Sequence, residues 1–443
     1  MFGSKTSTTV GEQGVSVGDS RSLWRRDLAA LLGGALIKTT FLGVLSAGHV
    51  VDVQAETTFA PRVNQRLLVN TNRRLQPDPP EGTVYGESTD LRLGVEMAQE
   101  RWSLQATPRV LVTRYTSEQD YDTEEYFLTS AFARQWERTS FNSTFDVSRT
   151  ATISSELFQG VNQARPLNQD NVETGFNVAH ALNERLTLSA NYFYNLTSFE
   201  DAPEIQQFFV DYRYHTGGAT LSYQFSPNTQ WFTTLSYAFF KTVDATPQDS
   251  RNRTWTGFAG ISHAFDDTLD ASLAAGQNVG TVALDGVPGE VSAGGLFLNF
   301  NFEKRFEKST FSGAYSEQVQ PSSLGGQRNS NVAEANYQYR FDERWRANVN
   351  FRREQDEAQA DVQLAPGFVL PGIQFLQRRV MNLNSNIAYR IDKEWQILGQ
   401  YQFRRVTRDA TQTNPNAFKA TGHLVGIAIN WGAEPTLANE FWY

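Results

Sequence analysis

Charged side chains that alternate with amides are the features of this sequence best suited to chemistry. Arg346, Asn348, Asn350 and Arg352 occupy every second position of one segment. In a β-strand all four would share one face, because successive side chains point to opposite sides. Such a face either attracts anionic solutes or forms cross-strand ion pairs that brace the sheet. Candidate residues at equivalent positions elsewhere are Arg92, Arg109, Arg305, Arg340, Arg404, Glu96, Glu303 and Glu334, together with Asp146 and Asp270.

The residue types that usually carry catalysis and metal binding are sparse. His180, His215, His263 and His423 lie in distant segments, and no two have the spacing of a ligand pair. The sequence contains no cysteine, so it offers neither disulfides nor thiolate ligands. It also contains no phosphate loop, calcium loop or zinc motif. We predict no catalytic residue, no metal and no cofactor; a hydrolase would require His180 or His423 to approach a serine or a carboxylate.

Short polar turns between hydrophobic residues organise the segments that carry these side chains. Phe341-Asp342-Glu343-Arg344-Trp345 joins two segments in which apolar and polar residues alternate. Residues 391–395 repeat the pattern closely, and residues 182–186 repeat it with leucine at both edges. A period of two on both sides of a short turn predicts a β-hairpin.

The same period predicts eighteen strands, joined alternately by short turns and longer polar loops. This asymmetry is typical of an all-β, antiparallel, up-and-down transmembrane β-barrel with short periplasmic turns and long outer loops. The sheet must close, because lipid offers no hydrogen-bond partner to an open edge. A soluble sandwich or propeller would mix the two kinds of connection. The predicted strands are 59–72, 83–98, 102–115, 123–136, 139–153, 170–182, 186–199, 207–225, 230–242, 254–265, 269–280, 292–306, 310–320, 332–341, 345–354, 379–391, 395–406 and 418–431.

One predicted strand, 207–225, contains a reversal of phase. Tyr212 and Tyr214 are apolar at even positions, whereas Leu221 and Tyr223 are apolar at odd ones. The change falls at Gly217-Gly218, where either a bulge restores the facing or a turn changes the topology.

The two faces of the predicted wall differ in chemistry. Leu186, Leu188 and Tyr192 would face lipid, while Asn191 and Asn195 would face inward. Unpaired buried amides cost a few kcal/mol each, so we expect a wet lumen. Barrels of about 16 to 18 strands generally leave an aqueous channel.

Aromatic residues gather beside the short turns, and two long loops are candidates for a constriction. The aromatic pattern predicts an interfacial girdle. Loops 154–169 and 355–378 could narrow the lumen, and the second is apolar enough to fold over the pore, dock on a partner or pack among the outer loops. Its constriction candidates are Phe368, Leu370 and Phe375. The girdle candidates are Trp102, Trp136, Phe225, Trp231, Phe265, Phe306, Phe341, Trp345, Trp395 and Trp431.

Residues 1–55 have the features of a cleaved signal peptide. Arg25 and Arg26 precede an apolar stretch that Lys38 interrupts, and Val53-Gln54-Ala55 resembles a cleavage site. The alternative, a membrane anchor, requires about 18 to 20 uninterrupted apolar residues. We therefore expect one barrel domain over residues 56–443. The formal net charge of −9 argues against nucleic acid as a partner.

The whole mature chain resembles the β-barrel porin families of Gram-negative bacteria, in particular the outer-membrane barrels associated with exosortase and exopolysaccharide loci. The resemblance rests on residues 66–72, on 88–94 and on the Asp-Glu-Arg-Trp type of turn. Residues 418–431 and the terminal Phe441-Trp442-Tyr443 both resemble the endings that the barrel assembly machinery recognises. The resemblance implies an outer-membrane location and a role beside polysaccharide secretion, and it transfers no site residue.

Two functions follow as hypotheses. The first is a porin-like channel for small solutes or for export of a polysaccharide, with the lipid bilayer, lipopolysaccharide and the barrel assembly machinery as partners and a homo-oligomer as a possible state. The second is a plugged accessory or structural barrel of an exopolysaccharide or surface-protein sorting system, which binds a partner through its outer loops.

Overall fold

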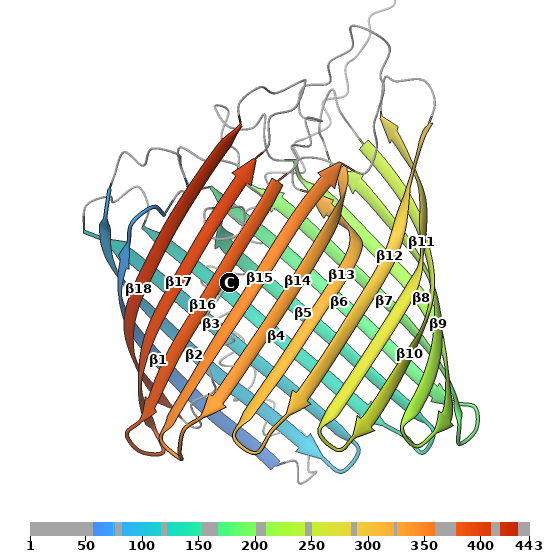
Figure 1. Ribbon diagram of the computed structural model, residues 1–443, viewed down its shortest axis with the longest axis horizontal. Coiled ribbons are helices and arrows are strands. Elements are labelled where there is room, and N and C mark those ends of the chain that lie inside the picture. Colours follow the sequence, from blue (N-terminus) through green and yellow to red (C-terminus); the bar gives the residue numbers. More distant parts are fainter. Residues whose placement is uncertain are drawn as a thin grey trace, which may run out of the picture. The chain divides into compact units, whose positions relative to one another are not determined.

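The chain folds into one closed antiparallel sheet of eighteen strands, seen from the side in the computed structural model (Figure 1). The structure describes residues 56–73, 75, 82–116, 122–152, 167–200, 210–243, 250–284, 290–322, 326–358, 378–408 and 417–432. The prediction of an 18-stranded up-and-down barrel is confirmed. The strands are β1 (Glu56–Asn70), β2 (Val84–Gln99), β3 (Trp102–Tyr115), β4 (Thr123–Gln135), β5 (Thr139–Ala151), β6 (Asn168–Ala181), β7 (Leu186–Phe199), β8 (Tyr212–Ser226), β9 (Thr229–Thr242), β10 (Ser250–Asp266), β11 (Leu269–Leu284), β12 (Glu290–Arg305), β13 (Ser309–Ser322), β14 (Gly326–Arg340), β15 (Trp345–Ala358), β16 (Arg378–Arg390), β17 (Trp395–Arg408) and β18 (Phe418–Gly432).

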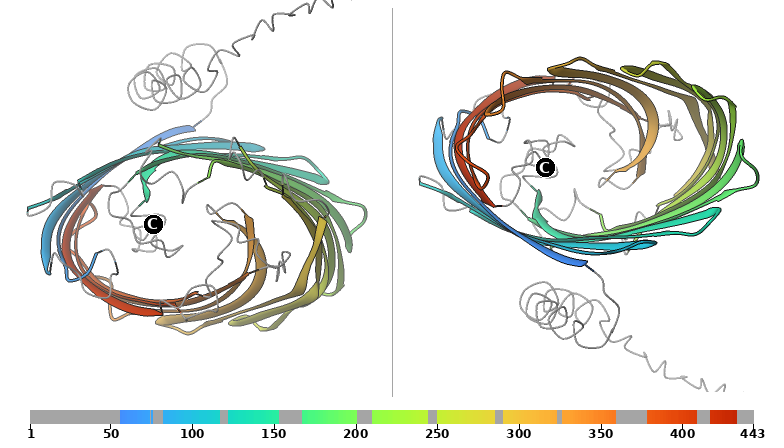
Figure 2. Two further views of the ribbon diagram at one scale, coloured as in Figure 1. Left: turned by 90° about the horizontal axis from the view of Figure 1, so that it is seen from above. Right: turned by 90° about the horizontal axis from the view of Figure 1, so that it is seen from below.

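Each strand pairs with its neighbours in sequence, and the first strand pairs with the last. The β1–β18 ladder runs from Arg62 opposite Gly432 to Asn70 opposite Leu424. This ladder removes the two free edges that an open sheet would expose. Figure 2 shows the closed ring of strands end-on. No helix among the described residues is long and apolar enough to cross a membrane.

The strand predicted at 207–225 starts later than predicted and has neither a bulge nor a turn at Gly217-Gly218. It begins at Tyr212 and runs through Gly217-Gly218 without a register shift; the only shift against β9 lies between Gln224 and Ser226. Tyr212 and Tyr214 instead belong to an apolar cluster on the inner face around the fully buried Phe240. The reversal of phase therefore reflects a local hydrophobic lining, and neither a turn nor a bulge at the glycines.

Several strands extend further at their loop ends than the alternation indicates. β10 begins at Ser250 rather than 254, and β14 begins at Gly326 rather than 332. Beyond those points both faces are polar, so the apolar period disappears while the hydrogen-bonded ladder continues. The expected signal peptide 1–55, the ending Phe441-Trp442-Tyr443 and the constriction candidates Phe368, Leu370 and Phe375 lie outside the described residues.

The outer face of the barrel is apolar and exposed. Leu67 is 64% exposed and Ile427 is 62% exposed, and each lies on a strand whose alternate residues face the interior. In water such a surface would cost about 25 cal/mol per Å² of apolar area, which favours burial in lipid. The hydrophobic effect therefore favours burial of the outer face in lipid, while the inner face is mainly polar apart from clusters such as the one around Phe240.

Side-chain oxygens close the short turns. Asp342 Oδ1 accepts hydrogen bonds from the backbone N–H groups of Arg344 (2.7 Å) and Trp345 (2.7 Å). Asp392 makes the same pair of bonds one hairpin further on, and Asn183 makes it between β6 and β7. A short Asp or Asn side chain reaches its own turn backbone more readily than any longer residue, which explains the recurring turn sequence.

These bonds give the turn a pH dependence. The backbone N–H groups of Trp345 and Arg344 hold the pKa of the Asp342 carboxyl below its usual range. Because the pKa of Asp342 is lower in the folded state than in the unfolded state, its hydrogen bonds stabilise the fold fully at a pH above the ordinary carboxyl pKa. This stabilisation is lost as the pH falls through the lowered pKa of the folded state.

We expect Asp342→Ala to lower the urea midpoint of the barrel at pH 7 and to have a progressively smaller effect at acidic pH. Asp342→Asn, which keeps an accepting oxygen, should lie closer to the wild type. A tryptophan-fluorescence titration at several pH values measures both differences; an Asp342→Ala deficit that grows on acidification would contradict this assignment.

Candidate functional site: the lumen wall

All twelve predicted charged lumen residues lie on the inner face of the sheet, and most of them form ion pairs. On β2 and β3, Arg92 and Arg109 each donate to Asp90 at 3.0 Å. Asp90 is only 2% exposed. Arg109 also stacks over the ring of Phe127, with its guanidinium carbon 4.7 Å from the ring centroid. These two arginines therefore brace the wall.

A longer chain of ion pairs crosses β14, β15 and β16. Arg352 pairs with Glu334 and, at 3.1 Å, with Glu354. Glu354 also accepts from Arg378 at 3.3 Å, and Arg378 pairs with Asp356. Arg378 is only 3% exposed, so its charge depends on these carboxylates.

The other predicted charges occupy varied settings. Arg305 pairs with Asp270 and lies 3.6 Å from Glu303. Glu96 accepts a hydrogen bond from Gln105 at 3.3 Å, and Arg404 donates to the backbone carbonyl of Arg73 at 3.4 Å. Asp146 on β5 lies directly opposite Glu173 on β6.

Three arginines at the turn end of the lumen form a cationic group. Arg340 lies opposite Arg346 in the β14–β15 ladder, and Arg390 ends the neighbouring strand β16. None of the ion pairs within the described ranges involves these three residues. We name Arg340, Arg346 and Arg390 the arginine triplet; its uncompensated positive charge favours anions near this mouth of the barrel.

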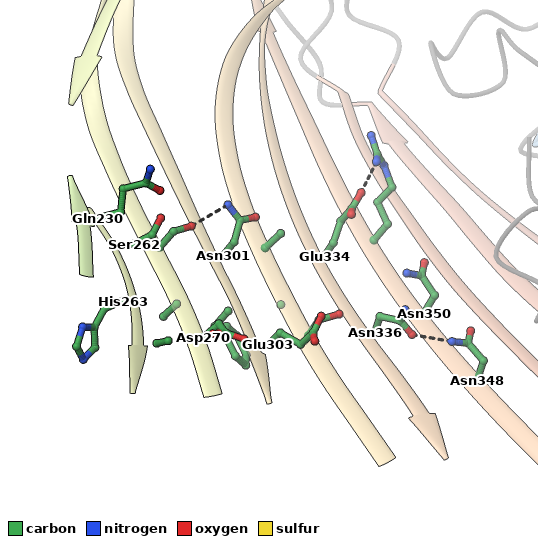
Figure 3. Close-up of a pocket in the computed structure, with 18 of the residues that line it drawn as sticks. Gln230, Ser262, His263, Asp270, Asn301, Glu303, Glu334, Asn336, Asn348 and Asn350 are labelled. Atoms are coloured by element: carbon green, nitrogen blue, oxygen red, sulfur yellow. Dashed lines mark hydrogen bonds and ion pairs between the residues drawn. The ribbon is translucent and has the colours of Figure 1, made fainter. Parts of the chain in front are cut away.

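Amide side chains cover the lumen wall next to these charges. Asn348 donates to Asn336 Oδ1 at 2.7 Å, and both residues face the cavity in Figure 3. Asn386 and Gln400 lie opposite each other in the β16–β17 ladder and are only 5% and 4% exposed. Neither has a hydrogen-bond partner for its side-chain oxygen or nitrogen within the described structure. We call this surface the amide face; its members are Asn336, Asn348, Asn350, Asn382, Asn384, Asn386, Gln400 and Gln402.

Six members of the amide face, all but Asn386 and Gln400, border a cavity of about 1010 Å³ inside the barrel. Its wall runs from Gln230 and Ser262 across Asn301 to Asn336 and Asn348 (Figure 3), and Asn384 and Gln402 also line it. This volume is at the upper end of the range for small-molecule sites, which is about 300–1,000 Å³. The lining is dominated by amides and hydroxyls, so the cavity suits solutes that both donate and accept hydrogen bonds.

Among the described residues, each of the four histidines contacts the hydroxyl of a threonine or a tyrosine, and not that of a serine. His180 Nδ1 lies 2.8 Å from Thr139 Oγ1, and His423 Nδ1 lies 3.0 Å from Tyr401 Oη. His215 and His263 likewise contact the hydroxyls of a tyrosine and a threonine. Within the described ranges, no group of three or more histidine, aspartate and glutamate side chains could hold a metal ion.

The predicted girdle residues lie at the turn ends of the strands, on the outer face. Trp395 and Trp431 are direct partners in the β17–β18 ladder. The Trp102 indole donates to Gln99 at 2.6 Å, and that of Trp431 to Glu394 at 3.3 Å. Phe225, Trp231, Phe265, Phe306, Phe341 and Trp345 occupy corresponding positions on other hairpins, and Trp136 follows β4.

Sequence reasoning missed several members of the wall. Asp90 alternates in phase with Arg92, so the two-residue period could have identified it. Arg378 was assigned to a long loop, although it begins β16. Arg390 ends the same strand and completes the arginine triplet, which only the arrangement of neighbouring strands reveals.

Comparisons with known proteins add little to this geometry. No family model matches the chain, and no curated protein matches it. Among solved structures, Acinetobacter baumannii OccAB4 aligns with 11% identity and a TM-score of 0.42 over 86% of this chain and 98% of its own. Pseudomonas aeruginosa OpdQ aligns with 12% identity and a TM-score of 0.40 over 85% and 98%. The copper transporter OprC aligns with 9% identity and a TM-score of 0.42 over 84% and 80%. At these scores the likenesses carry no argument about function, which rests on the barrel itself.

Proposed function

We propose that this chain is a passive channel of the outer membrane of a Gram-negative bacterium, through which small polar solutes cross. The apolar outer face, the aromatic residues at the turn ends and the closed sheet support a membrane location. The polar inner face supports passage of water-soluble cargo. Such a channel uses no cofactor and no catalytic residue.

The amide face is the observation that indicates a class of solute. An amide offers an acceptor and two donor hydrogens, which complement neighbouring hydroxyls of a sugar. Leaving the side-chain oxygens of the cavity-lining Asn382 and Asn384 without partners would cost about 1–3 kcal/mol per group, so these amides need water or a hydroxyl-rich solute. The proposed cargo is therefore an uncharged polyol or sugar. A polysaccharide presents the same hydroxyl groups as a free sugar, so its export would use the same hydrogen bonds. Such export agrees with the resemblance to barrels of exosortase and exopolysaccharide loci.

We expect the double variant Asn382→Leu/Asn384→Leu to separate transport from stability. It removes two side-chain oxygens that lack partners, so the free energy of unfolding should stay within about 1 kcal/mol of the wild type or rise. Sugar uptake into liposomes should saturate at a concentration about tenfold higher, because two hydrogen-bonding side chains are lost.

A matched control is Asn191→Leu, which changes an amide of β7 outside the amide face. It should leave the saturation of uptake unchanged. Equal uptake by the double variant and the wild type would show that the amide face does not bind cargo.

The second candidate is a plugged accessory barrel that binds a partner through its outer loops. The near-complete burial of Asn386 and Gln400 favours it, because residues that line an open aqueous channel are ordinarily exposed. Uptake of sugar by liposomes that contain folded barrel distinguishes the two, since a plugged barrel gives none. Contacts with the barrel assembly machinery, lipopolysaccharide or a second copy of the chain are compatible with both candidates.

A further inference from the structure

A row of cations crosses the outer face of the barrel at the loop ends of three adjacent strands. Arg213 on β8 lies directly opposite Lys241 on β9, and Lys241 lies directly opposite Arg251 on β10. Arg253 lies two residues further along β10 on the same face. Arg213, Arg251 and Arg253 are exposed, and Lys241 is partly exposed. We name these four residues the basic row.

Like charges directly opposite each other in a sheet are destabilising, so the basic row calls for an anion. No ion pair joins Arg213, Lys241 or Arg253 to a carboxylate within the described parts of the chain. The outer face of β3–β6 is different at the loop ends of its strands. There Arg114 pairs with Glu124, and Arg149 lies 3.5 Å from Asp170. Arg114 and Arg149 are thus neutralised within the protein, whereas Arg213, Lys241 and Arg253 have no carboxylate partner among the described residues and are left to an external one.

An apolar groove of about 520 Å³ lies on the same strands, nearer the middle of the outer face. Leucines form its sides, and small residues such as Ala219, Gly257 and Ala275 form its floor. A side chain added at Gly257 would meet only Leu235 Cδ1, at 3.9 Å, so space is open there. Between the groove and the basic row lie the rings of Trp255 and Tyr237, with centroids 4.8 Å apart.

A cationic row above an apolar groove matches one class of ligand, a lipid with a phosphorylated headgroup. Arg253 and Gly257 are four residues apart, about 13 Å along the strand, which an acyl chain spans. Guanidinium groups bind phosphate oxygens through paired, charge-assisted hydrogen bonds. A free phosphate would satisfy the cations but would leave the groove empty.

We propose that the outer face of β8–β10 is a specific site for a phosphorylated glycolipid of the outer leaflet. Its phosphate groups lie on Arg213, Lys241 and Arg253, and one acyl chain lies in the groove that Gly257 leaves open. The site rests on the proposed membrane location, and it deepens that proposal by naming the lipid class and the residues that hold it.

Native mass spectrometry of the full-length barrel in detergent, titrated with bisphosphorylated lipid A, tests the site. We expect the wild type to retain one lipid A molecule. Arg213→Gln/Lys241→Gln/Arg253→Gln should weaken this binding roughly a hundredfold, since each surface cation contributes about 1 kcal/mol toward an anionic lipid. Gly257→Leu should weaken binding by filling the groove. The matched control Arg114→Gln/Arg149→Gln should stay within about threefold of the wild type.

Two outcomes would overturn the proposal. Equal retention of lipid A by the wild type and the triple variant would remove the role of the basic row. Displacement of lipid A by millimolar inorganic phosphate, together with normal binding by Gly257→Leu, would show a site for free phosphate rather than lipid. Heat-dependent migration on gels verifies that each variant is folded. A barrel that binds lipid A but passes no solute would contradict the proposed channel and leave the lipid site intact. A barrel that conducts but binds no lipid A would contradict only the lipid site.

Discussion

Replacing Arg340, Arg346 and Arg390 together by glutamine is expected to reduce the preference of the channel for anions over cations about tenfold. Each charge about 8 Å from a permeating ion in water contributes about 0.5 kcal/mol, and the three contributions act in the same direction. The effect should be large because the arginine triplet has no carboxylate partner among the described residues. Reversal potentials under a salt gradient measure the preference directly.

A control for this variant removes the same number of cations outside the lumen. Arg185, Arg344 and Lys393 lie in the exposed turns at the same rim. Their replacement by glutamine should leave the reversal potential nearly unchanged. The difference between the two triple variants should shrink as salt rises, because the Debye length falls from about 10 Å at 0.1 M to about 3 Å at 1 M. A reversal potential that responds equally to both would show that the triplet is not the selectivity element.

Asp90→Asn is expected to lower the free energy of unfolding by about 3 kcal/mol or more, the typical cost of removing one partner of a buried ion pair. The carboxylate is buried and accepts from both Arg92 and Arg109, so the substitution leaves two guanidinium groups without it. Urea unfolding in lipid vesicles provides the measurement. The same variant should increase anion preference, because it adds positive charge to the wall.

Glu96→Gln is the matched control, since it neutralises a carboxylate on the same strand and the same face. Glu96 is exposed and accepts one hydrogen bond, from Gln105, so the cost should stay below about 1 kcal/mol. Equal effects of the two substitutions would mean that Asp90 does not brace the arginines.

The sequence predicted the strands well because each residue's facing depends only on its own strand. The alternation of Trp345, Ala347 and Val349 with Arg346, Asn348 and Asn350 is visible without any knowledge of neighbours. The turns were predictable for the same reason, since Asp342 bonds to residues two and three positions later. Failure came where local alternation ended, as at the starts of β10 and β14.

Contacts between strands could not be predicted, because they depend on the stagger of one strand against the next. Asp90 meets Arg109 across the β2–β3 ladder, and Arg378 meets Glu354, 24 positions earlier in the sequence. A shift of one strand against the next by two residues would leave each side chain on the same face of the sheet but would change every cross-strand pair. The arginine triplet and the basic row emerge only from this register, although each of their residues is obvious in the sequence.

Planar-bilayer recording of the purified, folded barrel tests whether it forms an open channel. We expect steady open-channel conductance, a preference for anions that the arginine triplet sets, and partial block by neutral sugars that the amide face binds. Reproducible absence of conductance from barrel that is demonstrably folded and inserted would contradict the channel and favour the plugged accessory barrel.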